Sequence, residues 1–136
     1  MTAEVDVRDC RKQQDNSTHL DSIFKFAQDA GRATGVVTNT RLTHATPAAT
    51  YAQSASRVWE SNSNTPHGCD DIAHQMINGR VGSKLDVIMG GGLSHFLPEE
   101  SSGLRTDGRN LINEYHELQR QQNSRFVYVT DRVSKK

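Results

Sequence analysis

The sequence predicts an α/β fold in which a mostly parallel sheet carries helices on both faces. Three short apolar segments rich in β-branched residues alternate along the chain with segments whose apolar residues recur at helical spacing. Parallel strands need long crossover connections, so this alternation favours a parallel sheet. Three strands are few for such a sheet, and its edges and faces would be covered only if further strands came from elsewhere. The sequence shows no second domain, so we expect one domain over residues 1–136 whose sheet is complete only with strands from elsewhere.

The first predicted helix precedes the first strand. Its apolar residues have the i, i+3, i+4, i+7 spacing of one helix face, at Leu20, Ile23, Phe24 and Ala27. Gly31 suits its C-terminal end. The triplet of Asn16, Ser17 and Thr18 ahead of it makes Asn16 an acceptor for N-glycosylation if the chain enters the secretory pathway. The competing interpretation is that Ser17 or Thr18 caps the helix.

A strand over residues 33–38 comes next, because this segment is β-branched and is bounded by glycine and polar residues. Pro47 suits the first turn of a second helix, since its missing N–H would have no intrahelical partner there, and Thr46 suits the N-cap. This helix is expected to run to about Trp59. The later predicted elements are a polar loop over residues 60–68, a helix over 72–77, a strand over 85–89, a helix over 111–118 and a strand over 126–129.

Composition excludes several classes of partner. Sixteen Lys and Arg residues balance sixteen Asp and Glu residues, so the net charge gives no reason to expect a nucleic acid or an anionic membrane. No apolar run reaches the roughly 18 residues of a membrane span, and the N-terminal residues lack the basic and apolar regions of a signal peptide. Only 34% of residues are hydrophobic, which predicts a globular chain with a thin core.

One polar segment is placed to bind a ligand. Residues 41–47 follow the first strand and lead into a helix, which is where open α/β sheets bind ligands. In an extended backbone His44 and Thr46 point to the same side and could converge on a cation or its waters. The alternative is a capping threonine beside a surface histidine.

Arg57 could bind a phosphate or carboxylate through its forked guanidinium group. Distance is the objection, because an unbroken helix would hold it roughly 15 Å from Thr46. The two residues can share a site only if the helix ends early or the ligand lies between them.

Neither the glycines nor the cysteines identify a site by themselves. The three glycines at residues 90–92 fit neither phosphate-binding glycine pattern, so a tight turn is expected there. Cys10 and Cys69 are the only cysteines, and their spacing alone fits either a disulfide or two buried thiols.

Residues 35–52, with the sequence GVVTNTRLTHATPAATYA, resemble a stretch of the animal alkaline phosphatases. The similarity continues, in the family's order and with similar gaps, through residues 56–59, 68–73, 86–92 and 105–108. It covers most of the chain. The resemblance implies an alkaline-phosphatase-like fold of which residues 1–136 are a partial domain, an interior segment with only part of the sheet. The glycines at residues 90–92 would be a conformational feature of that fold.

The resemblance also implies roles for single residues. His44 and Thr46 match the family's magnesium-site histidine and hydroxyl residue, and Arg57 matches the arginine that holds the substrate phosphate. Cys10 and Cys69 match a disulfide pair, which implies an extracellular or cell-surface parent protein.

The implied activity is hydrolysis of phosphate monoesters by a zinc- and magnesium-dependent homodimer, through a phosphoserine intermediate. Any membrane contact would be made through a lipid anchor outside this segment. The family's nucleophilic serine, in an Asp-Ser-Ala context, and its zinc ligands lie outside the matched region, so the chain alone is expected to be inactive. No calcium ligand is assigned, because residues 98–101 are shorter than the matching family segment. The alternative is a non-catalytic extracellular binding or decoy module derived from a phosphatase gene.

Overall fold

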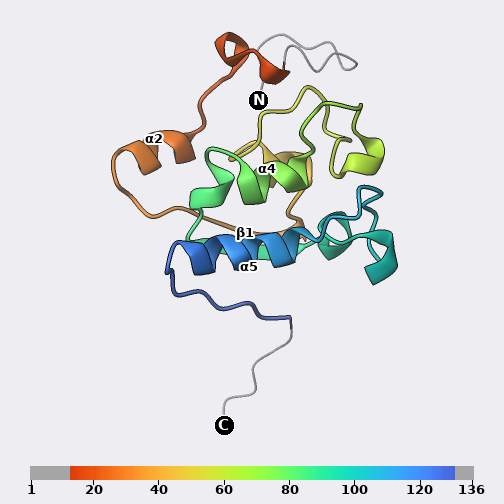
Figure 1. The fold of residues 1–136 in the computed structure, drawn as a ribbon. Coiled ribbons are helices and arrows are strands. Elements are labelled where there is room, and N and C mark those ends of the chain that lie inside the picture. Colours follow the sequence, from red (N-terminus) through yellow and green to blue (C-terminus); the bar gives the residue numbers. More distant parts are fainter. Residues whose placement is uncertain (1–12, 131–136) are drawn as a thin grey trace.

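Two parallel strands form the sheet of this molecule, for which the computed structural model describes residues 13–130 (Figure 1). Strand β1 (Gly35–Arg41) pairs with strand β2 (Val87–Gly91), and Val36 lies opposite Ile88. Both strands begin two residues later than the sequence predicted. The α/β class and the partial parallel sheet are therefore confirmed.

One face of the sheet carries exposed apolar side chains. The exposed fraction is 69% for Val37, 49% for Val87 and 61% for Met89. Val36 points to the opposite face and is buried. Because sheets of this kind are covered on both faces in a complete domain, these exposed side chains fit a sheet that is only partly present.

Helix α2 (Ile23–Asp29) confirms the first predicted helix. Its N-cap is Ser22, whose hydroxyl accepts a hydrogen bond from the backbone N–H of Lys25 at 3.3 Å. Gly31 follows the helix with a φ of 68°, a left-handed conformation that glycine adopts without strain.

The interpretation that Ser17 or Thr18 caps this helix is wrong. Both residues belong to a separate 3-10 turn, η1 (Asn16–Thr18), in which the Thr18 N–H donates to the Asp15 carbonyl at 3.0 Å. Four residues separate this turn from α2, and a different hydroxyl caps the helix. Glycosylation at Asn16 stays a prediction.

Helix α3 (Ala45–Ala48) is a single turn, so the predicted helix to Trp59 is wrong. The chain leaves the helix because tertiary partners replace the helical ones. The side-chain amide of Gln75 accepts a hydrogen bond from the Gln53 N–H at 2.7 Å and donates to the Gln53 carbonyl at 2.9 Å. With both backbone groups of Gln53 paired in this way, the helix cannot continue through it.

Helices α4 (Ile72–Asn78) and α5 (Leu111–Gln121) confirm the two later predicted helices. The side chain of Asp71 caps α4, and that of Asn110 caps α5. The other 3-10 turns are Asn62–Asn64, Gly82–Lys84, Leu93–His95 and Glu99–Ser101. No helix within residues 13–130 has the length and apolar character that crossing a membrane requires.

The third predicted strand, over residues 126–129, does not form. Its aromatic rings contact α5 instead: the ring centroid of Phe126 lies 5.1 Å from that of His116, and the centroid of Tyr128 lies 5.3 Å from the same histidine. A hollow of about 960 Å³ is lined both by this segment and by β2. The strand prediction is wrong, because aromatic contacts with α5 take the place of backbone pairing.

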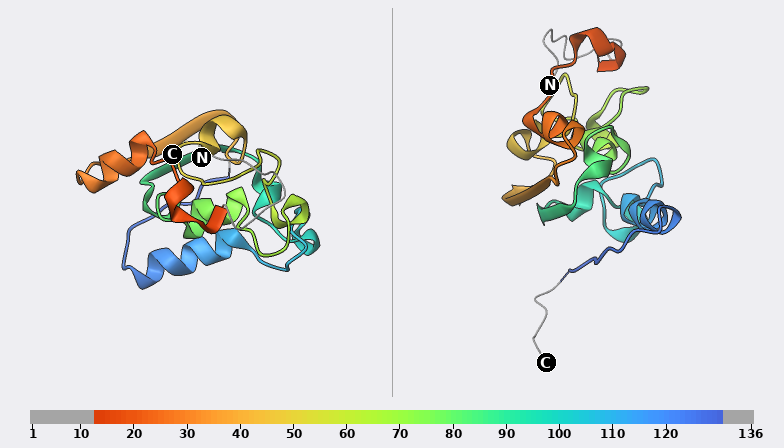
Figure 2. Two further views of the ribbon diagram at one scale, coloured as in Figure 1. Left: turned by 90° about the horizontal axis from the view of Figure 1, so that it is seen from above. Right: turned by 90° about the vertical axis from the view of Figure 1, so that its left-hand side faces the viewer.

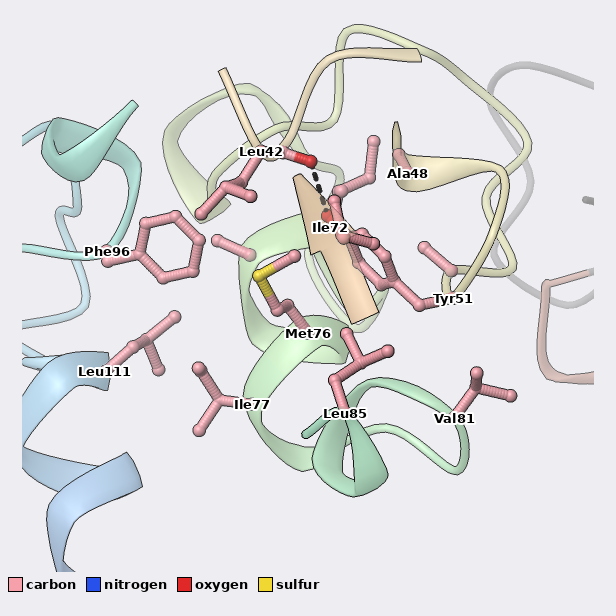
Figure 3. Close-up of a cluster of buried hydrophobic side chains, with 13 residues drawn as sticks. Leu42, Ala48, Tyr51, Ile72, Met76, Ile77, Val81, Leu85, Phe96 and Leu111 are labelled. Carbon is pink, nitrogen blue, oxygen red and sulfur yellow. Dashed lines mark hydrogen bonds between the residues drawn. The ribbon is translucent and has the colours of Figure 1, made fainter. Parts of the chain in front are cut away.

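The core is built around α4. Seen from above, α4 lies between β1 and α5 (Figure 2). Met76 and Ile77 of this helix are 1% and 4% exposed, with Phe96 and Leu111 to one side and Tyr51 to the other (Figure 3). The remaining buried members are Val36, Leu42, Ala48, Ala52, Ile72, Ala73, Val81 and Leu85. This packing fixes the end of β1 against the N-terminal end of α4, next to the candidate site.

Candidate functional site

The carboxyl ends of β1 and β2 meet where the candidate ligand-binding segment begins. The N–H of Leu42 donates to the carbonyl of Gly91 at 3.0 Å, so the chain after β1 stays attached to the end of β2. His44 follows two residues later and occupies the N-cap position of α3. The structure thus places His44 at the edge of the sheet where α/β folds bind ligands.

Arg57 comes to the same place because α3 ends early. Its guanidinium Nη2 lies 3.4 Å from Nε2 of His44, with the arginine donating. Arg57 is exposed and His44 is half-buried, so a ligand can reach both. The sequence analysis required an early end of this helix before Arg57 could reach the start of it, and the helix does end early.

Thr46 does not share this contact. Residues Ala45–Ala48 are helical, so the expectation that His44 and Thr46 point to the same side of an extended backbone does not apply. Thr46 is exposed and lies inside the single turn of α3. The prediction that Thr46 is the N-cap of this helix is wrong, because His44 occupies that position. The pairing of the two residues at a magnesium site stays a prediction.

Sequence reasoning missed the Glu60 carboxylate, which contacts Thr43, the residue next to His44. Glu60 accepts hydrogen bonds from Nε and Nη2 of Arg41, both at 2.8 Å, and from Oγ1 of Thr43 at 2.7 Å. The bonds from Arg41 are the main reason that the pKa of Glu60 falls from 4.5 to about 2. Nε2 of His95 lies 3.4 Å from the same carboxylate, and burial lowers the pKa of His95. No spacing rule joins two residues 19 positions apart, so the sequence held no signal for this contact.

The lowered pKa of Glu60 predicts a contribution to acid sensitivity. Because its folded pKa of about 2 lies below the unfolded value of 4.5, its contribution to stability is fully present above the unfolded pKa and is lost as the pH falls towards the folded pKa. We expect stability to fall more steeply between about pH 5 and pH 2 in the natural chain than in a Glu60→Gln variant. Urea unfolding at successive pH values, followed by circular dichroism, measures both slopes. Equal slopes would contradict the pairing.

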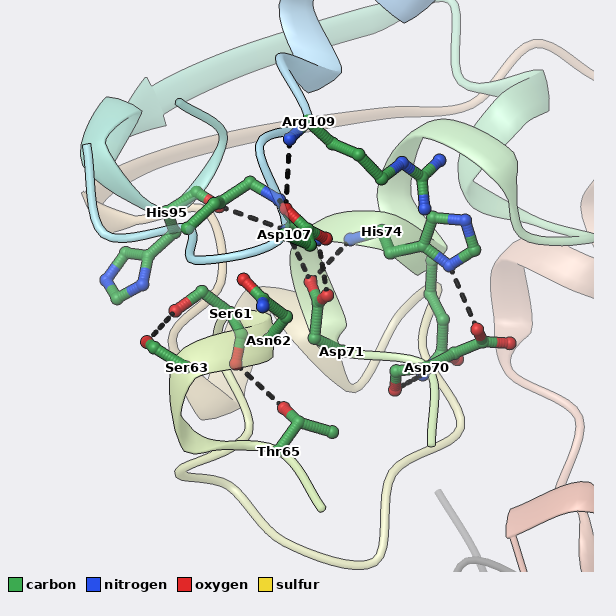
Figure 4. Close-up of polar contacts among 12 residues, drawn as sticks. Ser61, Asn62, Ser63, Thr65, Asp70, Asp71, His74, His95, Asp107 and Arg109 are labelled. Carbon is green, nitrogen blue, oxygen red and sulfur yellow. Dashed lines mark hydrogen bonds and ion pairs between the residues drawn. The ribbon is translucent and has the colours of Figure 1, made fainter. Parts of the chain in front are cut away.

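A second polar cluster is centred on the buried side chains of Arg105 and Asp71, and Figure 4 shows Asp71 and Asp107 among its polar contacts. The guanidinium of Arg105, 1% exposed, donates to both carboxylate oxygens of Asp71, at 3.0 and 2.9 Å. It also donates to both carboxylate oxygens of Asp107, at 3.1 and 2.6 Å. Asp71 accepts the His74 N–H at 2.8 Å as the cap of α4. Residues 105–108, which carried part of the resemblance, therefore tie their loop to the start of α4.

The described residues supply at most part of a metal site. Among residues 13–130, no group of three or more His, Cys, Asp or Glu side chains could hold a metal ion. Magnesium prefers six ligands, mostly oxygen and often including several waters, and His44 with Thr46 would provide two donors. His44 and Thr46 can therefore be part of a magnesium site only if further ligands come from outside these residues.

The predicted disulfide between Cys10 and Cys69 stays a prediction, because Cys10 lies outside the described residues. Cys69 is half-buried in a turn, where its backbone N–H donates to the carbonyl of Pro66 at 3.1 Å. The turn belongs to the polar loop that precedes α4.

Comparison with known proteins gives one consistent family. The family model for alkaline phosphatase matches residues 5–135. The membrane-bound alkaline phosphatase of Bombyx mori is 41% identical over 144 residues, covering 97% of this chain and 26% of that protein. The tissue-nonspecific isozyme of Homo sapiens is 37% identical over 136 residues, covering 88% of this chain and 25% of that protein. The alkaline phosphatase of Gadus morhua is 36% identical over 136 residues, covering 86% of this chain and 28% of that protein. The chain thus spans about a quarter of the length of these relatives.

Proposed function

The chain belongs to the alkaline phosphatase family, and from this premise we propose that it is a segment of a metal-dependent phosphomonoesterase and supplies the arginine that binds the substrate phosphate. The observation that carries the proposal is the 3.4 Å contact between Arg57 and His44 at the carboxyl edge of the sheet. A guanidinium suits a phosphate, because two parallel N–H groups can donate to two of its oxygens. Arg57 is exposed, so a phosphate can approach it.

In the proposed reaction Arg57 holds two non-bridging oxygens of the phosphoryl group and offsets their negative charge in the transition state. His44 and Thr46 would hold magnesium together with ligands from outside this segment. Bound zinc and magnesium in such an enzyme supply activation of the nucleophile and neutralisation of charge. A serine from the rest of the enzyme would accept the phosphoryl group, and water would then release it as phosphate.

We place the whole protein outside the cell or at the cell surface, as a homodimer. The name of the Bombyx mori relative, a membrane-bound enzyme, supports the cell surface. A disulfide between Cys10 and Cys69 and a glycan at Asn16 belong to the same proposal, because both arise in the secretory pathway. The lipid anchor would lie outside this segment.

A segment transplant tests the proposed function. This chain would replace the matching segment of the Bombyx mori enzyme, and hydrolysis of p-nitrophenyl phosphate would be measured. We expect the transplanted enzyme to hydrolyse the ester, and the purified chain alone to show no turnover above buffer, because the nucleophile and zinc ligands are expected outside this segment. The control carries the corresponding segment of the Gadus morhua enzyme, a second alkaline phosphatase, which is 36% identical to this chain.

Two outcomes would count against this proposal. An inactive transplant beside an active control would overturn it and would favour the non-catalytic binding module. Substantial turnover by the purified chain would show that the nucleophile lies within residues 1–136 after all.

A further inference from the structure

Glu60 joins three parts of the fold at the candidate site. Its backbone carbonyl accepts the N–H of Ala73 at 3.2 Å, and the carbonyl of Trp59 accepts the N–H of Ile72 at 2.8 Å. Residues 59 and 60 are therefore attached to the first turn of α4. The side chain of Trp59 is 3% exposed, which anchors the same point in the core.

The Glu60 carboxylate reaches from this anchor to the end of β1. It takes two parallel N–H bonds from Arg41 and one O–H bond from Thr43. Such a two-pronged pairing fixes orientation as well as distance, because the guanidinium and the carboxylate are both planar. Thr43 is fully buried, so its hydroxyl is surrounded by other parts of the fold.

The positions of the two candidate site residues follow from this attachment. His44 comes directly after Thr43, and Arg57 lies three residues before Glu60. The direct contact between Arg57 and His44, at 3.4 Å, is at the long end of the hydrogen-bond range and is too weak to fix the distance by itself. The hydrogen bonds that Glu60 accepts from Arg41 and Thr43, at 2.8 and 2.7 Å, are shorter and stronger than this contact.

We propose that Glu60 is a positioning residue that holds Arg57 beside His44 in the geometry that binds phosphate. The inference rests on the proposed function, since it concerns the phosphate contact assigned there to Arg57. Glu60 itself touches no substrate. It acts by joining the end of β1, through Arg41 and Thr43, to the loop that carries Arg57.

The test compares four variants of the full chain in binding inorganic phosphate, one of which is Arg57→Ala. Glu60→Gln replaces one carboxylate oxygen by an amide NH2 group, which donates hydrogen bonds and cannot accept the N–H of Arg41. Arg41→Ala breaks the same pairing from the side of Arg41, whose side chain is 48% exposed, so we expect this variant to fold. The matched control is Glu114→Gln, which breaks an equally two-pronged pair with Arg109, at 2.8 and 2.5 Å, on α5.

The readout is the Nε–Hε resonance of Arg57 in a ¹⁵N spectrum, before and during titration with inorganic phosphate. We expect Glu60→Gln and Arg41→Ala to shift this resonance without phosphate and to weaken phosphate binding by roughly tenfold, because small misplacements of a binding group are costly. Glu114→Gln should leave both unchanged. A merely stabilising role for Glu60 would not move the Arg57 resonance in a chain that is still folded.

The possible outcomes separate the two proposals. If the natural chain binds phosphate and Arg57→Ala abolishes binding, while Glu60→Gln and Arg41→Ala bind like the natural chain, the positioning role is overturned and the proposed function stands. If Arg57→Ala binds phosphate as tightly as the natural chain does, the phosphate contact is overturned and the positioning role with it. If the natural chain binds no phosphate, the Arg57 resonance decides, and an unchanged resonance in Glu60→Gln and Arg41→Ala overturns the positioning role. If Glu60→Gln fails to fold, Arg41→Ala decides.

Discussion

Replacing Arg105 by methionine is expected to destabilise the fold by about 3–5 kcal/mol. The substitution keeps an unbranched side chain of similar length, so the loss does not come from an empty cavity. It comes from Asp71, which is 3% exposed and would keep its buried carboxylate without the two guanidinium bonds. Asp71 also caps α4, and α4 lies at the centre of the core. The measurement is urea unfolding followed by circular dichroism.

The matched control for this prediction is Arg120→Met on α5. Arg120 pairs with Glu117, but the two side chains are 66% and 61% exposed, so their pairing is screened by water. We expect a change within about 0.5 kcal/mol there. If Arg105→Met and Arg120→Met cost the same, Asp71 is hydrated when its partner is lost, and the buried cluster does not hold the loop of residues 105–108 to α4.

The elements predicted correctly are those whose local pattern agrees with their packing. In α4 the apolar residues recur at helical spacing, and Ile72, Met76 and Ile77 are all buried in the core. The segment after α3 lacks this agreement. Its helical pattern is overridden by the amide of Gln75, which pairs with the backbone of Gln53 from 22 residues away. A single sequence contains no sign of such a partner.

Residues 126–129 failed as a predicted strand for a related reason. A short run of apolar and aromatic residues forms a strand only if an edge is available to pair with. Here the rings of Phe126 and Tyr128 find a partner in His116 of α5, while the hollow beside β2 stays open. The same pattern would favour pairing with β2 in a molecule where that contact with α5 did not form.

The residues of the candidate site that match the family could be predicted from the sequence. The residues that join the site only through contacts in the folded chain could not. His44 and Arg57 were identified in advance, and the structure brings them together. Glu60 could not have been identified from the sequence, because its proposed role depends on a contact with Arg41 that forms only in the folded chain. The charged residues of segment 105–108 carried part of the resemblance, yet they serve the stability of the fold.

In the transplanted Bombyx mori enzyme, Arg57→Ala is expected to lower kcat/KM for p-nitrophenyl phosphate by about 100- to 1000-fold. The guanidinium donates to oxygens whose charge changes during phosphoryl transfer, so its loss weakens the transition state more than the bound substrate. Arg57 is exposed, and its guanidinium lies 3.4 Å from Nε2 of His44 at the surface, so the fold should not change. Initial rates over a range of substrate concentrations, with circular dichroism for the fold, provide the measurement.

Two further variants separate the effect of the forked guanidinium from that of positive charge alone and from that of losing any exposed arginine. Arg57→Lys keeps the positive charge but loses the forked pair of donors, so we expect an intermediate loss of kcat/KM. Arg120→Ala removes an exposed arginine on α5 and should leave the rate unchanged. If lysine restored the full rate, charge alone would account for the effect. If alanine at position 57 left the rate unchanged, the phosphate would be held by another residue, and the contact between Arg57 and His44 would have no part in the reaction.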